Sequence, residues 1–236
     1  GIYGEDGSVL RKNLIRCREE KIVNTYVVFG IFGMISNFVA ALADVPLVRP
    51  GKAGANEGIS MDGINPWWAD VPAKRFKVSF WLSFLGQPGA YITLWLLADL
   101  IAKESTPLAL ALRINTLIGC YTGLLCHLYF CMKPLLYQKL CKKVSDDESA
   151  EIMKAIDPVT RVPMLIGGLA LWLGGTILVA IAIITGALAV SKWCLLLNPI
   201  VALIIVMILK KCRVRVIGGL GAGYMLMSLL LIIAGI

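Results

Sequence analysis

The chain has 236 residues, of which 58% are hydrophobic and only 16% are charged, and its formal net charge is +8. This composition, with a mean hydropathy of +0.79, excludes an ordinary soluble domain. Because Lys and Arg gather near the ends of apolar segments, the positive charge indicates contact with anionic lipid headgroups and excludes nucleic acid as a partner.

Six apolar segments follow one another, near residues 22–48, 78–102, 109–132, 163–190, 193–209 and 216–236. Segments of this length and composition are typical of helices that cross a bilayer. The sequence therefore predicts an all-α fold, a polytopic membrane helix bundle with six transmembrane helices. It predicts a single membrane domain over residues 1–236, with a basic N-terminal tail (1–21), a long interfacial loop (49–77) and an amphipathic loop (133–162).

The first segment carries an ordered stripe of small and polar residues. They follow one another by three or four residues: Tyr26, Gly30, Gly33, Asn37, Ala40 and Asp44. This spacing places them on one face of a helix. We expect that face to pack against other helices while the bulky apolar face contacts lipid. Gly30, Gly33 and, in the fourth segment, Gly175 are predicted helix contacts.

The long loop and the second segment add two features. Trp68 belongs to a Trp pair beside basic residues, which suits a membrane interface or a lid over a site at that face. The second segment contains Gln87 next to Pro88 near its middle. Proline inside a helix removes a hydrogen bond and bends the helix, so Gln87 is expected near a polar cavity at mid-membrane.

The third segment has a second stripe with the same spacing. It comprises Arg113, Thr116, Cys120, Gly123, His127, Cys131 and Pro134. His127 is the single histidine of the chain, and the seven cysteines form no C-x-x-C pair, so no metal site and no cofactor are predicted. Farther on, Asn198-Pro199 opens the fifth segment.

Asp44 and His127 lie late in two helices that run in the same direction, which places both near the same membrane face. A carboxylate and an imidazole in a medium of low dielectric constant interact strongly, and they are the candidate catalytic acid–base pair. Five other side chains are predicted to bind a substrate: Asn37, Trp68, Gln87, Arg113 and Asn198.

Three functions remain open. The first is binding or transport of a small or lipid-like molecule in a polar intramembrane cavity. The second is a lipid-phase membrane enzyme that uses His127 and Asp44, and the third is a structural or partner subunit without chemistry. The expected partners are membrane lipids and a small hydrophobic or amphipathic ligand, and a homo-oligomer is left open.

A family resemblance rests on short motifs in three segments. They are Gly30-x-x-Gly33 with Asp44, His127 ahead of Lys133-Pro134, and Leu197-Asn198-Pro199. Their order resembles an uncharacterised bacterial family of six-helix integral membrane proteins. The resemblance implies a membrane location and no known activity. The expected location is the bacterial inner (cytoplasmic) membrane.

Overall fold

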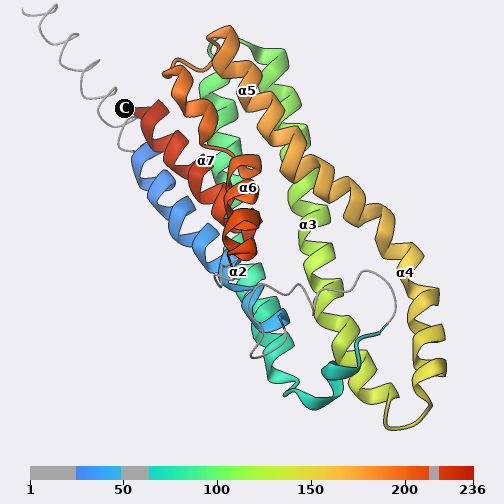
Figure 1. The fold of residues 1–236 in the computed structure, drawn as a ribbon. Coiled ribbons are helices and arrows are strands. Elements are labelled where there is room, and N and C mark those ends of the chain that lie inside the picture. Colours follow the sequence, from blue (N-terminus) through green and yellow to red (C-terminus); the bar gives the residue numbers. More distant parts are fainter. Residues whose placement is uncertain (1–24, 49–63, 213–217) are drawn as a thin grey trace, which may run out of the picture.

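The computed structural model describes residues 25–48, 64–212 and 218–236 (Figure 1). The predicted tail at 1–21 lies outside the described residues, as do residues 49–63 of the predicted interfacial loop.

The described residues are all-α. The first helix covers residues 25–42 and is followed by a short 3-10 turn, η1 (Val45–Leu47). The remaining elements are η2 (Pro66–Asp70), α2 (Lys74–Ile101), α3 (Thr106–Leu140), α4 (Asp146–Gly168), η3 (Leu169–Gly174), α5 (Gly175–Thr185), η4 (Lys192–Leu196), α6 (Pro199–Lys211) and α7 (Gly219–Gly235). α4, η3 and α5 continue into one another and form one long helical rod. With the first helix, α2, α3, α6 and α7, the described residues therefore form six helical rods.

Four of these rods are long and apolar enough to cross a membrane: Thr25–Leu47, Lys74–Ile101, Thr106–Leu140 and Asp146–Thr185. The other two, α6 and α7, are apolar but shorter. The four long rods indicate an integral membrane protein. Large apolar side chains point outward along them, among them Phe32, Trp81 and Leu117.

The predicted small-residue stripe is the packed face of the first helix. A Cβ added to Gly30 would meet Ile232 of α7, and one added to Gly33 would lie 2.5 Å from Thr93 Oγ1 of α2. Gly235 at the end of α7 lies against Tyr26 at the start of the first helix. The first helix and α7 are therefore antiparallel neighbours, as Figure 1 shows.

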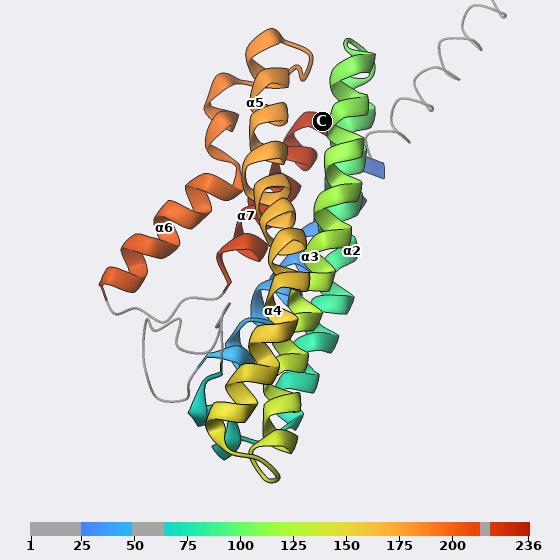
Figure 2. The ribbon, with the colours of Figure 1, turned by 90° about the vertical axis from the view of Figure 1, so that its right-hand side faces the viewer.

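Two apolar clusters hold the bundle. The larger one joins α2, α3, α5 and α7 through fully buried side chains such as Leu97, Leu112 and Met227. The smaller one lies at the other end, where Trp68, Phe76 and Tyr137 pack together. In Figure 2, α6 leans away from the bundle, while α2, α3 and α4 run side by side.

The prediction of an amphipathic loop at 133–162 is wrong, because helix continues on both sides of a short turn. α3 runs through Pro134 to Leu140, and α4 begins at Asp146. Ser145 caps α4, accepting from the Glu148 backbone N–H in a capping box. Two charges of this stretch, Lys133 and Asp157, are buried and form an ion pair between α3 and α4.

Candidate functional site

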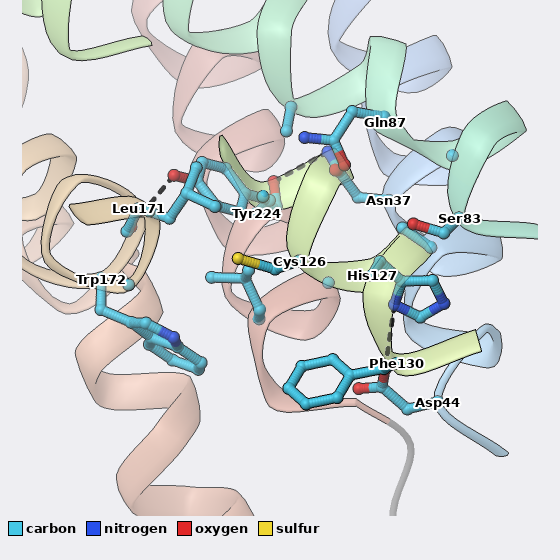
Figure 3. Close-up of a pocket in the computed structure, with 18 of the residues that line it drawn as sticks. Asn37, Asp44, Ser83, Gln87, Cys126, His127, Phe130, Leu171, Trp172 and Tyr224 are labelled. Atoms are coloured by element: carbon cyan, nitrogen blue, oxygen red, sulfur yellow. Dashed lines mark hydrogen bonds and ion pairs between the residues drawn. The ribbon is translucent and has the colours of Figure 1, made fainter. Parts of the chain in front are cut away.

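A cavity of about 280 Å³ lies inside the bundle, with walls from the first helix, α2, α3, α4, η3 and α7. Its polar lining residues include Asn37, Asp44, Ser83, Gln87 and His127. Apolar and aromatic side chains complete the lining, including Phe130, Leu171 and Trp172. In Figure 3, Trp172 lies across the cavity from Gln87 and Ser83, so the space has a polar side and an apolar side.

The structure brings Asp44 and His127 together at this wall. Asp44 follows the first helix directly, and His127 lies in α3, one turn before Cys131. The distance from His127 Nδ1 to Asp44 Oδ1 is 3.9 Å. This is close enough for an ion pair when the ring is protonated but too long for a direct hydrogen bond. The side chain of His127 is 13% exposed and that of Asp44 is 38% exposed.

Ser79 of α2 fixes the histidine ring from its other side. The Ser79 Oγ lies 2.7 Å from the carbonyl oxygen of Ala43, and this contact uses its single hydroxyl hydrogen because a carbonyl can only accept. The same oxygen is 3.0 Å from His127 Nε2. His127 Nε2 must therefore donate to Ser79, which leaves the Nδ1 of a neutral ring with a lone pair on the side of Asp44.

The order Ser79, His127 and Asp44 resembles the arrangement of a serine hydrolase triad. Ser79, however, is 0% exposed, is absent from the cavity wall and gives its hydrogen to Ala43. A nucleophile has to reach a substrate and pass its proton to the histidine. Ser79 thus fixes the ring of His127 from behind, and of these three residues only His127 and Asp44 line the cavity.

Asn37 and Gln87 hold the cavity walls together. Asn37 Nδ2 donates to Ser228 Oγ at 3.2 Å and to the Tyr224 carbonyl at 3.4 Å, which joins the first helix to α7. Gln87 Nε2 donates to the Cys120 carbonyl at 3.0 Å, which joins α2 to α3. Both side chains therefore have a structural partner as well as a place on the cavity lining.

The π-helical turn η3 forms the apolar side. A π turn shifts the backbone hydrogen bonds by one residue and often marks a functional position. Asn115 Nδ2 donates to the Ala170 carbonyl at 3.1 Å, and the Tyr224 hydroxyl donates to the Leu171 carbonyl at 3.0 Å. Side chains of α3 and α7 thus hold this turn, which presents Leu171 and Trp172 to the cavity.

Three predicted substrate-binding residues lie outside the cavity. Arg113 forms an ion pair with Asp99 near the start of α3. Trp68 is buried at the opposite end, edge-on to Tyr137. Asn198 caps α6, because its Oδ1 accepts from the backbone N–H groups of Ile200 and Val201 at 2.9 and 3.0 Å. Each has a structural role at its position.

A family model described as "Family of unknown function (DUF6796)" matches residues 15–236. The chain belongs to this family. The match spans all six rods and every residue of the cavity lining. Neither the comparison with curated proteins nor the comparison with solved structures found a match.

Sequence reasoning did not identify Ser79, Tyr224 and Trp172 of this DUF6796 chain as site residues. A signal for Ser79 was present, because α2 has its own stripe of small residues at spacings of three and four: Ser79, Ser83, Gly86, Ala90 and Thr93. No comparable pattern pointed to Trp172, whose position depends on the π turn. In the described part of the chain, no group of three or more His, Cys, Asp or Glu side chains is arranged to hold a metal ion.

Proposed function

We propose that this DUF6796 protein binds a small amphiphilic molecule in its intramembrane cavity and carries it across the membrane. The observation that supports binding is the cavity itself, with polar groups on one side and Trp172 and Leu171 on the other. Its volume of about 280 Å³ is small for a binding site. A whole phospholipid has a much larger volume than this cavity, so the expected ligand is a small molecule.

Two irregular helices support a transport role. α2 contains Pro88 within the helix next to Gln87, and the rod of α4 and α5 contains the π turn. Irregular helices beside a midplane cavity are a recurrent feature of membrane carriers, because local changes in hydrogen bonding let helix halves move.

We further propose that all six helices cross the membrane and that this membrane is the inner (cytoplasmic) membrane of a bacterium. α3 has 35 residues and is about 52 Å long, whereas the hydrocarbon core is about 30 Å thick. We therefore place the turn between α3 and α4 outside the membrane. With 13 residues, α6 spans about 20 Å and needs flanking residues or local thinning of the bilayer to complete its crossing.

Six crossings return the chain to the side on which it started. Tyr26 and Gly235 are already neighbours at one end of the bundle. Single cysteines placed at the two termini should therefore react with a membrane-impermeant reagent from the same side of sealed vesicles. Labelling from opposite sides would mean an odd number of crossings.

The binding proposal is tested by filling the cavity. Cys126 lies on the cavity wall, and replacing it with Trp puts a large ring into the space. In a thermal-shift screen of small amphiphiles, compounds that stabilise the wild type should lose at least about tenfold in apparent affinity in Cys126→Trp. Cys212→Trp, at an exposed position, is the matched control.

Equal stabilisation of wild type and Cys126→Trp by every compound would contradict binding in the cavity. Size-exclusion chromatography establishes that each variant is folded. If Cys126→Trp does not fold, the smaller Cys126→Leu takes its place.

A second candidate function is acid–base catalysis on the bound molecule. It is supported by the lone pair of His127 Nδ1, which faces Asp44 at the cavity wall. The two functions differ in the effect of His127→Gln on a ligand found in the screen. A carrier without chemistry returns that compound unchanged, whereas an enzyme converts it and His127→Gln abolishes the conversion.

A further inference from the structure

The contact between His127 and Asp44 indicates which chemical class of ligand the cavity accepts. The neutral ring offers a lone pair at Nδ1, and the carboxylate offers only acceptors. These two acceptor atoms are 3.9 Å apart, which leaves no direct hydrogen bond between them. A ligand atom with two hydrogens to donate can lie within hydrogen-bond distance of both acceptors and bridge them.

A primary amine meets this requirement. Its nitrogen carries two hydrogens when neutral and three when protonated, so it can donate to Nδ1 and Oδ1 together. A hydroxyl has one hydrogen and serves only one of them, and a carboxylate has none and would be repelled by Asp44.

The rest of the lining agrees with an amine. Among the described lining residues, Asp44 is the one carboxylate and His127 the one imidazole, and none is a Lys or an Arg. In Figure 3, Phe130 lies beside Asp44, and Trp172 forms another part of the wall. Aromatic rings contact the apolar body of an amine and attract an ammonium group through their faces.

From these observations we infer that the ligand is a small amphipathic amine, whose nitrogen bridges His127 Nδ1 and Asp44 Oδ1 and whose apolar part lies toward Phe130 and Trp172. The inference rests on the proposed function, since it names the ligand class of the same cavity. Ser79 belongs to this site as a positioning residue, because it determines which nitrogen of His127 faces the ligand.

The test uses three probes that differ only in the polar group: benzylamine, benzyl alcohol and benzoate. Their single ring is small enough for a cavity of about 280 Å³. At millimolar concentration and neutral pH, benzylamine should raise the melting temperature of the purified protein by about 2–4 °C. Benzyl alcohol should have a smaller effect, and benzoate none.

Two substitutions test the bridge itself. Asp44→Asn removes the carboxylate at nearly constant shape. His127→Gln places an amide close to the position of Nε2, which preserves the contact with Ser79 and removes the Nδ1 acceptor. Each should weaken the apparent affinity for benzylamine about tenfold and leave that for benzyl alcohol within about twofold. Glu151→Gln, which neutralises an exposed carboxylate on α4, is the matched charge control and should change neither affinity.

The outcomes separate the two proposals. If all three probes stabilise the wild type equally and Cys126→Trp abolishes the effect, the cavity binds ligands but the amine class is wrong. If benzylamine stabilises Cys126→Trp as much as the wild type, its site lies elsewhere and the proposed function is wrong as well. Absence of any stabilisation by benzylamine also overturns the inference.

Discussion

Replacing Asp157 with Leu should lower the free energy of unfolding by about 3–5 kcal/mol. Asp157 Oδ1 accepts from Lys133 Nζ at 2.8 Å and from the Tyr129 hydroxyl, and the Lys133 and Asp157 side chains are 1% and 8% exposed. The substitution leaves the Lys133 ammonium buried without this carboxylate. A buried charge that loses its counter-ion is far more costly than the loss of an exposed ion pair.

The double variant Lys133→Met with Asp157→Leu is the control for this prediction. It removes both charges and fills their place with apolar groups, so it should recover most of the lost stability. Thermal unfolding in one detergent compares the three proteins. A cost below about 1 kcal/mol for Asp157→Leu, or a double variant no more stable than the single one, would contradict a stabilising ion pair between α3 and α4.

Gly33→Leu should destabilise the bundle by about 3 kcal/mol, which corresponds to a fall in melting temperature of about 10 °C. A Cβ at Gly33 would lie 2.5 Å from Thr93 Oγ1 and 2.7 Å from Ser228 Oγ. These oxygens are 2.9 Å apart and hydrogen-bonded to each other, and Asn37 donates to Ser228. The hydrogen bonds fix both hydroxyls in place. The first helix, α2 and α7 would therefore have to move apart to admit the new side chain.

Gly168→Ala is the matched control, because a Cβ at Gly168 meets nothing within 4 Å. Alanine is also the better helix former, so this variant should be at least as stable as the wild type. Gly33→Ala should be less stable than the wild type despite the same gain in helix propensity. If Gly33→Leu has the same melting temperature as the wild type, the assignment of Gly33 to a packed face of the first helix is wrong.

Sequence patterns predicted the packed faces because small residues at spacings of three and four have one physical use in a membrane helix. They allow close approach of a neighbour, as at Gly33. The same spacing placed Asn37 and His127 on inward faces, whereas Gln87 was indicated by the neighbouring Pro88, and all three line the cavity. Membership of one stripe does not place residues at the same depth. Arg113 and His127 belong to the same stripe but lie 14 positions, about 21 Å, apart along the helix.

Other parts of the site depend on tertiary contacts that sequence patterns do not show. The side chains of Asn115 and Tyr224 donate hydrogen bonds to two backbone carbonyls of the π turn at Leu169–Gly174. No local sequence preference predicts a π turn at this position. Likewise, Pro134 and Pro158 suggested a loop because proline disfavours a helix interior. The buried contact of Lys133 with Asp157 stabilises the helices in that region.

Reaction of Cys126 with a small charged thiol reagent tests most directly whether the cavity between the helices is open to small polar molecules, because such a reagent is excluded from lipid. Cys126 lines the cavity, whereas Cys120 of the same helix is buried in the apolar core. In vesicles, a protein with Cys126 as its single cysteine should be modified at least tenfold faster than one with Cys120 alone, and benzylamine should slow the reaction. Equally slow modification of Cys126 and Cys120 would contradict an open cavity.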